Sequence, residues 1–251
     1  MNTSSNGYVM GFAIGVCVVI SAALALTANS LKPIQAEAAE FDRPKNVMMA
    51  AGLVAADDTR TVAELKKLYV DRVKEVVVNT KTGEVLQGKS AKDAAQMNKE
   101  AAAADKADKS AASRFRVVAT TVDQAGKIES VILPISGKGL WSTIYGYLAL
   151  EGDLENVRGV TFYKHGETPG LGGECENPQW CAQWKGKSIR DEQKKLVGVQ
   201  VKKGKVDSSI AAEKAHKVDG LSGATITSDG ITRFVLADLT AFEGYLKSLA
   251  K

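Results

Sequence analysis

The 251-residue sequence has few of the residues that hold metal ions. It contains three cysteines and two histidines, and no Cys-x-x-Cys motif occurs. Neither His165 nor His216 has another His or Cys at a helical ligand spacing. These absences argue against most metal sites, and we expect no resident metal.

Signals for nucleic-acid and dinucleotide binding are also missing. The net charge of +4 comes from 33 basic and 29 acidic residues, which are spread widely, and no basic patch is interleaved with aromatic residues. No Gly-x-Gly-x-x-Gly follows a predicted strand, so the chain lacks the usual NADH-binding loop. We therefore expect no nucleic-acid partner and no NADH site.

No charged side chain precedes Lys32, and residues 8–28 form an apolar run. At about 1.5 Å per residue, this run matches the roughly 30 Å of a bilayer's hydrocarbon core. We predict a transmembrane anchor over residues 1–30. A cleaved signal peptide is the alternative, but the first seven residues lack Lys and Arg and the run is long for a signal. The flanking charges do not fix the orientation.

Residues 31–113 are predicted to form a connector and an accessory region. Pro33, Pro44 and a shortage of large apolar groups suggest a connector over 30–60 that could contain a short helix. A helical period begins after Thr61, a plausible N-cap, and runs to residue 73. A short strand over 76–78 and a turn follow. Residues 90–113 are rich in Ala, Lys and Asp, which fits a solvent-exposed helix or an irregular segment on the surface.

Residues 114–251 have the pattern of an α+β domain. Two β-rich runs flank the turn at residues 123–126, which predicts a hairpin. The segment 141–150 reads as a helix, and 157–163 and 196–201 read as strands. Apolar residues recur at three- and four-residue steps over 228–249, which predicts an amphipathic helix packed on a sheet.

The segment DGLSGATITS, residues 219–228, stands directly before that last helix. Its four hydroxyls, on Ser222, Thr225, Thr227 and Ser228, could simply cap the helix. The free N–H groups and the helix dipole would equally suit a phosphate. Small neighbours at 223 and 224 would leave Thr225 open to a modifying enzyme. No histidine lies nearby in the sequence to activate the hydroxyl, so we do not expect self-modification.

Residues 219–225 match the motif Asp-x-x-(Ser/Thr)-Gly-Ala-Thr of proteins that are flavinylated by the periplasmic FMN transferase. The segments HGETPGLGGE (165–174) and SGKGLWSTIYGYLAL (136–150), with the single apolar helix, add to the match. The chain resembles the C-subunit family of the bacterial sodium-translocating NADH:quinone oxidoreductases, which carry a covalent FMN-binding domain. The resemblance covers the anchor and nearly all of residues 114–251.

The resemblance implies the roles of individual residues. Thr225 would receive one FMN per chain from FAD as a phosphoester. The phosphate turn and the surroundings of the flavin would involve a further set of residues: Ser222, Gly223, Ala224, Thr227, Glu167, Thr168, Leu171, Gly172, Leu140 and Trp141. Leu171 could cover a face of the isoalloxazine. Trp141 could contact the flavin or belong to the core.

Cys175 and Cys181 depart from the pattern expected of the family. In an oxidising periplasm, the pair could close a small disulfide in the loop after the flavin segment. We expect this disulfide rather than two free thiols, and we do not expect a catalytic dithiol because no Cys-x-x-Cys is present.

The implied function is electron relay: the FMN would take electrons from an iron–sulfur centre in membrane neighbours and pass them to another covalent FMN. The resemblance places the domain in the periplasm at the inner membrane. It implies other membrane and flavin subunits as partners, and a flavin transferase during maturation. Two alternatives stay open. One is the corresponding subunit of an Rnf-type ferredoxin:NAD oxidoreductase, and the other is a membrane-anchored binding protein without a cofactor.

Overall fold

The computed structural model describes residues 6–55, 57–108, 110–123 and 126–250. The chain divides into two compact units, Met1–Arg43 and Pro44–Lys251. The second unit starts well before residue 114, because strands β1 and β2 of the expected accessory region belong to the same sheet as the strands that follow. The boundary between compact units therefore falls nearer the N-terminus than the predicted boundary of the flavin domain.

Helix α1 (Asn6–Ala50) begins with the predicted apolar run. Its part Asn6–Lys32 has a mean hydropathy of 2.6 and is long enough to cross a membrane. The predicted connector was wrong, because the helix continues to Ala50 through Pro33 and Pro44. Each proline removes one backbone donor, but good helix formers such as Ala36 and Glu37 flank the first of them and favour continuation.

The sheet of the second unit has six strands in the order β2-β1-β3-β4-β5-β6, and all neighbours are antiparallel. The strands are β1 (Val73–Asn79), β2 (Val85–Leu86), β3 (Phe115–Val122), β4 (Ile128–Lys138), β5 (Thr143–Glu151) and β6 (Val157–Lys164). The predicted hairpin is confirmed as β3–β4. Gln124 and Ala125 of its turn lie outside the described residues.

The helix predicted over 141–150 was wrong, because this segment forms β5. β5 pairs with β4 on one side and with β6 on the other. Residues 146–150 are all buried. A strand that is covered in this way loses the alternating pattern and becomes hard to distinguish from a buried helix by sequence.

Two helices of the second unit start with capping boxes. α2 (Val62–Arg72) is capped by Thr61 as predicted, and α3 (Ala91–Ala104) is capped by Ser90. α3 confirms the solvated helix within 90–113, since most of its residues are exposed. A 3₁₀ turn, η1 (Ala111–Ser113), leads into β3.

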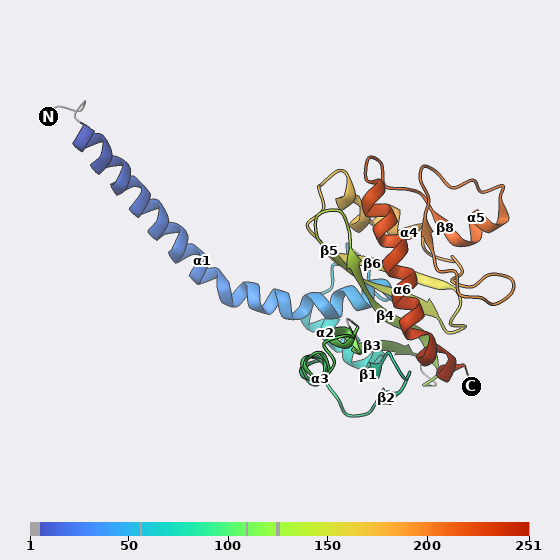
Figure 1. Cartoon of the computed structure of the whole chain (residues 1–251). Helices are drawn as coiled ribbons and strands as arrows, with labels where there is room; N and C mark the ends of the chain where they lie inside the picture. The colour runs from blue at the N-terminus through green and yellow to red at the C-terminus, as the bar shows by residue number, and fades with distance from the viewer. Residues whose placement is uncertain (1–5, 56, 109, 124–125, 251) are drawn as a thin grey trace. The chain divides into compact units, whose positions relative to one another are not determined.

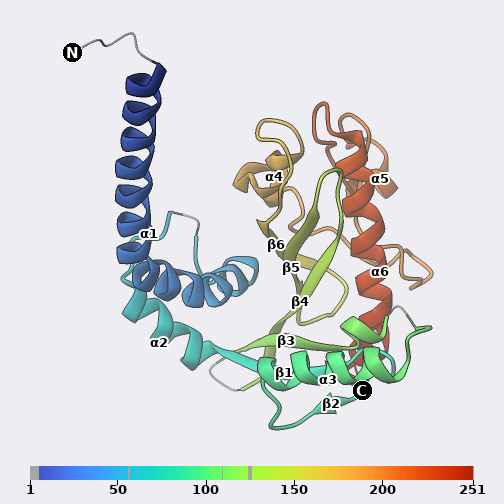
Figure 2. The ribbon, with the colours of Figure 1, turned by 60° about the vertical axis from the view of Figure 1, so that its left-hand side comes forward.

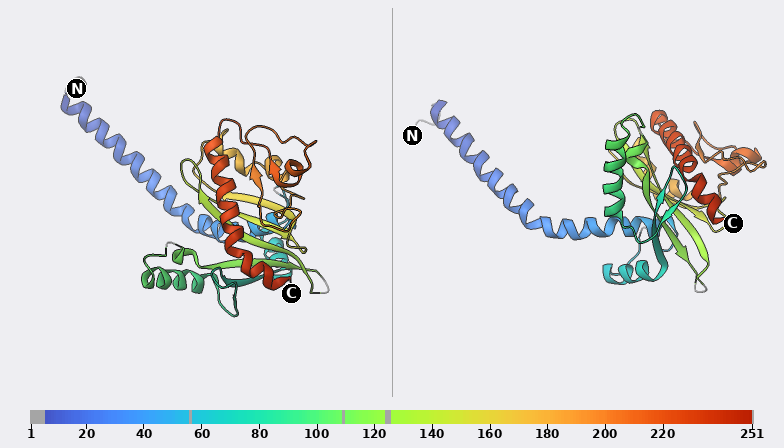
Figure 3. Two further views of the ribbon diagram at one scale, coloured as in Figure 1. Left: turned by 45° about the vertical axis from the view of Figure 1, so that its right-hand side comes forward. Right: turned by 60° about the horizontal axis from the view of Figure 1, so that its bottom comes forward.

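Helix α6 (Thr225–Leu249) begins three residues before the predicted start and packs against the sheet, mainly on β4. Figures 1 and 2 show it running beside β4, and both views of Figure 3 keep it against the sheet. Ile231, Val235, Leu239 and Phe242 are fully buried on its inner face. Each such side chain contributes about 1.5–3 kcal/mol by burial.

Short elements connect β6 to α6. They are η2 (Gly172–Glu176), α4 (Pro178–Ala182), β7 (Gln200–Val201), α5 (Ala211–His216) and β8 (Lys217–Val218). β7 and β8 form a separate two-stranded parallel sheet. The strand predicted over 196–201 is thus reduced to its last two residues, since Gly198 has a φ of 68° and interrupts the extended backbone.

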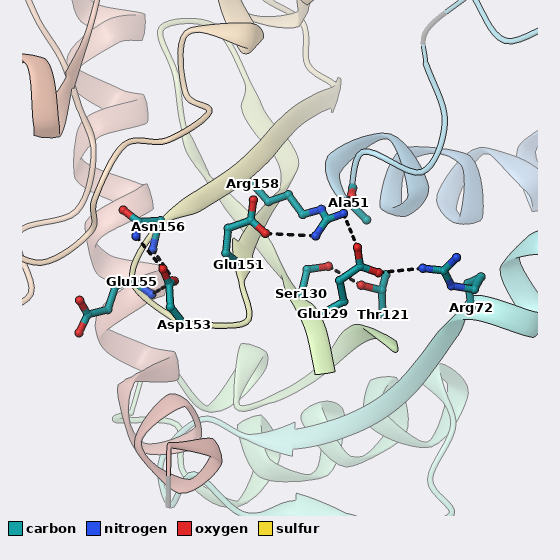
Figure 4. Close-up of polar contacts among 10 residues, drawn as sticks. All are labelled: Ala51, Arg72, Thr121, Glu129, Ser130, Glu151, Asp153, Glu155, Asn156 and Arg158. Atoms are coloured by element: carbon teal, nitrogen blue, oxygen red, sulfur yellow. Dashed lines mark hydrogen bonds and ion pairs between the residues drawn. The ribbon is translucent and has the colours of Figure 1, made fainter. Parts of the chain in front are cut away.

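A network of ion pairs centres on Arg158 of β6 (Figure 4). Its guanidinium donates to the Ala51 carbonyl at 2.7 Å and pairs with Glu129 at 2.7 Å and Glu151 at 3.1 Å. Arg72 binds the other oxygen of Glu129 at 2.8 Å. The network ties the chain after α1 and the end of α2 to strands β4, β5 and β6.

Candidate functional site

Helix α6 starts at Thr225, and its N-cap residue, Ala224, makes no side-chain hydrogen bond to the helix. The four hydroxyls of residues 219–228 therefore do not cap the helix in the way that their residue types allow. The first-turn N–H groups of a helix have no partner within the helix. Here they are left without a side-chain acceptor, which favours an anion at this end.

The four hydroxyls divide into a buried pair and an exposed pair. Thr227 and Ser228 are 1% and 4% exposed and have polar partners, Glu167 and the Leu221 amide. Ser222 and Thr225 are exposed, and their hydroxyls have no hydrogen bond within the described structure. Ser222 and Thr225 are thus the two hydroxyls that an external molecule can reach.

Glu167 is buried and joins three segments. Its carboxylate accepts the Thr227 hydroxyl at 2.6 Å. It also accepts the backbone amides of Leu140 at 3.1 Å, Trp141 at 2.9 Å and Ser142 at 3.1 Å. The β4–β5 turn, the loop after β6 and the first turn of α6 are therefore fixed to one another by one side chain.

Two opposing effects act on the pKa of Glu167. Burial disfavours the charged carboxylate and raises the pKa. The hydrogen bonds from Thr227, Ser142, Trp141 and Leu140 stabilise the charged form, and together they outweigh burial, so the pKa lies below the usual glutamate value. Glu167 is therefore an anion near neutral pH, fully engaged by its donors.

Four exposed apolar side chains belong to the segments that are joined at the start of α6. Leu140, Trp141, Leu171 and Ile226 are 41%, 66%, 42% and 56% exposed. Gly223 has a φ of 69°, and a Cβ on it would lie 2.8 Å from Cδ2 of Leu171, so this glycine allows Leu171 to approach the turn before Thr225. Trp141 is not a core residue. We refer to these four exposed side chains as the apolar surface, and side chains of this kind suit a flat aromatic ligand.

The remaining predicted residues of the glycine-rich loop lie around the same end of the molecule. Thr168 is exposed, and its carbonyl accepts the amides of Leu171 and Gly173, which closes a tight turn. Gly172 is buried beside Glu167 and Thr227. The loop is thus brought together with the 219–228 segment, although more than forty residues separate them.

Cys175 and Cys181 are both free thiols in the structure, so the predicted disulfide is not formed in it. The Cys181 thiol donates to the Cys175 carbonyl at 3.2 Å. Burial raises the pKa of each thiol to about 12. Both are therefore protonated near neutral pH and are poor nucleophiles.

The sequence did not predict the structural role of the Glu167 carboxylate. It was expected beside the flavin, but its carboxylate is buried and holds two loops in place. Ser142 was missed altogether. Its backbone amide donates a hydrogen bond to Glu167, and its hydroxyl accepts the Gly166 amide at 2.6 Å. The one signal in the sequence is a glutamate within a glycine-rich loop.

Comparison with known proteins agrees with this geometry. The family model of the FMN-binding domain matches residues 139–239, which include Leu140, Glu167, Leu171 and Thr225. The matched region therefore defines a protein with an FMN-binding domain.

Full-length relatives give the particular family. The C subunit of the Na(+)-translocating NADH-quinone reductase of Pseudomonas aeruginosa is 40% identical, over 100% of this chain and 98% of that protein. Its counterpart in Yersinia pestis is 36% identical, over 92% and 87%. The chain belongs to the C-subunit family of the Na(+)-translocating NADH-quinone reductases. These relatives carry that name rather than the name of an Rnf-type complex.

Solved structures share the fold. The crystal structure of NqrC from Shewanella oneidensis is 32% identical and matches with a TM-score of 0.67, over 84% of this chain and 96% of that chain. The corresponding reductase subunit from Parabacteroides distasonis is 25% identical, with a TM-score of 0.65, over 86% and 96%. The predicted α+β class with one apolar N-terminal helix is confirmed.

Proposed function

We propose that this chain is the flavin-carrying electron-transfer subunit of a Na(+)-translocating NADH-quinone reductase, with one FMN joined through its phosphate to Thr225. It acts as a subunit and does not oxidise NADH on its own. One observation carries the proposal: Thr225 is exposed at the start of a helix whose N-cap residue makes no side-chain hydrogen bond, its hydroxyl has no partner among the described residues, and it lies inside the region matched by the FMN-binding model.

The residues present fit an FMN. The free N–H groups at the start of α6 suit the phosphate at Thr225, and Ser222, Gly223 and Ala224 form the turn beside it. Leu140, Trp141, Leu171 and Ile226 offer apolar surface for the isoalloxazine. Flavins supply reversible electron transfer, while the protein sets their position and electronic environment.

Other residues of the site act by positioning. Glu167 holds the backbone of Leu140 and Trp141, and it holds Thr227 on the first turn of α6. The buried carboxylate accepts four hydrogen bonds. These bonds fix the backbone that carries Leu140 and Trp141 relative to the helix turn that carries Thr225. Thr168 and Gly172 shape the turn that carries Leu171.

The attachment of FMN requires a second protein. A threonine hydroxyl needs a base to become a nucleophile, and no side chain of the described residues is hydrogen-bonded to that of Thr225. A flavin transferase that uses FAD supplies this activation in our proposal. The exposure of Thr225 supports access by such an enzyme.

The N-terminal helix anchors the subunit in the inner membrane beside the other subunits of the complex, and the second unit lies in the periplasm. Asn6–Lys32 contains no acidic residue, so this helix alone offers no carboxylate for a sodium path. Covalent attachment keeps the FMN on the protein in a compartment where a lost cofactor is not replaced.

The proposal is tested by producing the chain with a flavin transferase and viewing a denaturing gel under ultraviolet light. The wild-type band should fluoresce, and Thr225→Val should abolish the fluorescence. Thr240→Val, a control on the exposed face of α6, should remain fluorescent. Fluorescence that survives Thr225→Val would contradict the attachment site, and a dark wild-type band would contradict covalent flavin altogether.

A further inference from the structure

A cavity of about 490 Å³ opens beside Thr225. Ser222 and Gly223 before α6, and Thr225 at its start, line one part of this cavity. A lysine-rich loop, residues 202–205, lines another part, and we call it the basic loop. Leu140, Trp141 and Leu171 do not line this cavity. Thr225 therefore borders a cavity whose lining includes lysines and aspartates, and it also lies next to residues of the apolar surface.

Backbone hydrogen bonds hold the basic loop in place. The Gly220 amide donates to the Gly204 carbonyl at 2.8 Å, and the Lys202 amide donates to the Val218 carbonyl at 2.9 Å. The Val206 amide donates to the Asp219 carboxylate at 2.7 Å. The loop is thus fastened to the first residues of the DGLSGAT segment, and its position relative to Thr225 is set by the fold.

Three lysines and two aspartates line the cavity. Lys202 is paired with Glu213. Lys203 and Lys205 are exposed and have no ion pair within the described structure. Two carboxylates, Asp219 and Asp229, also line the cavity, and Asp219 is occupied by the Val206 amide. Two free ammonium groups therefore stand at a cavity that contains the proposed attachment oxygen.

We propose that Lys203 and Lys205 bind the phosphate of the flavin nucleotide at Thr225. This inference rests on the proposed function. Lysine is a compact cation on a flexible stem and binds phosphate as a point charge, so exposed lysines at the rim can follow the phosphate without a fixed geometry.

The lysines can meet the flavin phosphate in two forms, first within FAD and then as the phosphodiester on Thr225. The Thr225 Oγ forms a bond to the FMN phosphorus of FAD, the pyrophosphate bond to the AMP half breaks, AMP leaves, and the hydroxyl proton passes to the base of the transferase. Before this step the lysines would face the pyrophosphate of FAD, and after it they would face the phosphodiester on Thr225. Both ligands present the same anionic phosphate oxygens.

The test compares Lys203→Gln/Lys205→Gln with a control, Lys66→Gln/Lys67→Gln, which removes two exposed charges of α2 that do not line the cavity. The first measurement is the rate of flavin incorporation from FAD with limiting transferase, at low and high salt. The second is the ³¹P resonance of the attached phosphodiester in the loaded chain. Equal urea midpoints check that all the variants are folded.

Incorporation about fivefold slower at low salt, with the difference reduced at high salt, would assign the lysines to FAD. A shifted ³¹P resonance would assign them to the attached phosphodiester. In either case Lys203→Arg/Lys205→Arg should restore the wild-type value. If both measurements match the control while the wild type carries flavin on Thr225, the lysine inference is wrong and the proposed function stands. A wild type without flavin on Thr225 would overturn both.

Discussion

The Thr227 hydroxyl donates to the Glu167 carboxylate over 2.6 Å, and both side chains are buried. The two residues are 60 positions apart, and Thr227 follows the proposed flavin attachment site by two positions. The same carboxylate holds the amides of Leu140 and Trp141. The contact between Thr227 and Glu167 thus fixes the position of the attachment site relative to the apolar surface that would receive the flavin ring.

Thr227→Val should destabilise the second unit by about 1.5–3 kcal/mol, because it removes the hydroxyl donor and leaves a buried carboxylate with one unsatisfied oxygen position. Unfolding in urea, followed by circular dichroism, measures the change. The control is Thr240→Val on the exposed face of α6, which should change stability by less than about 0.5 kcal/mol. Equal effects of the two substitutions would show that the contact with Glu167 contributes nothing.

Glu167→Gln should lower stability near neutral pH and should lose this effect in acid. The hydrogen bonds lower the pKa of Glu167 in the folded state, so the charged carboxylate stabilises the fold above the ordinary glutamate pKa of about 4.3. This stabilisation disappears as the pH falls through the folded-state pKa. The difference in urea midpoint between wild type and Glu167→Gln should therefore shrink as the pH decreases.

A matched control for that comparison is Glu100→Gln, on exposed helix α3, which should change the midpoint little at either pH. A difference for Glu167→Gln that stays constant from neutral to acidic pH would mean that the charge of the carboxylate is not what stabilises the site.

Trp141→Ala should barely affect folding, because the side chain is 66% exposed. In the flavin-loaded chain, the same substitution should raise flavin fluorescence, since a nearby indole ring quenches an excited flavin. The control Trp180→Ala should instead destabilise the fold by about 3–5 kcal/mol, since Trp180 is buried in the core. Unchanged flavin fluorescence in Trp141→Ala would remove this tryptophan from the flavin surface.

Cys175 and Cys181 should react slowly with thiol reagents near neutral pH, because burial raises the pKa of both thiols to about 12. A Cys17→Ser background leaves these two cysteines as the only thiols. The folded chain should show almost no labelling, and urea should expose two reactive thiols. Absence of reactive thiols in urea would show that the pair is oxidised to the disulfide that the sequence suggested.

Much of the fold could be predicted because several segments show a local sequence pattern that is typical of one secondary structure. Helix α6 has an unbroken apolar face, and Thr61 with Glu64 provides the capping box of α2. The hairpin β3–β4 follows from two β-rich runs around a turn. In each case the local preference and the tertiary environment agree.

The wrong secondary-structure predictions also have physical causes, because in each the tertiary environment or one backbone angle overrides the local sequence pattern. Residues 146–150 of β5 are buried on both faces of the sheet, so this apolar run carries no alternation that would separate it from a helix. Helix α1 passes Pro33 and Pro44, whose local penalty is outweighed by the rest of the helix. Gly198 takes a positive φ that shortens the last predicted strand to Gln200–Val201.

The candidate site was partly predictable. The resemblance to flavinylated proteins singled out Thr225 and Leu171, whereas the hydroxyls and small residues alone also fitted a helix cap. No local pattern could show that the Glu167 carboxylate accepts hydrogen bonds from residues 140–142 and 227. Those contacts form only when the sheet and α6 pack together. The basic loop was missed for the same reason, since its position depends on the pairing of β7 with β8.

Mass spectrometry of the tryptic peptide Val218–Arg233 is the most direct test of the central claim. The full chain should be purified from membranes of cells that contain the flavin transferase. We predict a peptide whose mass is increased by one FMN less one water, with fragment ions that place the increase on Thr225. An unmodified peptide, or an increase on Ser222, would contradict the account.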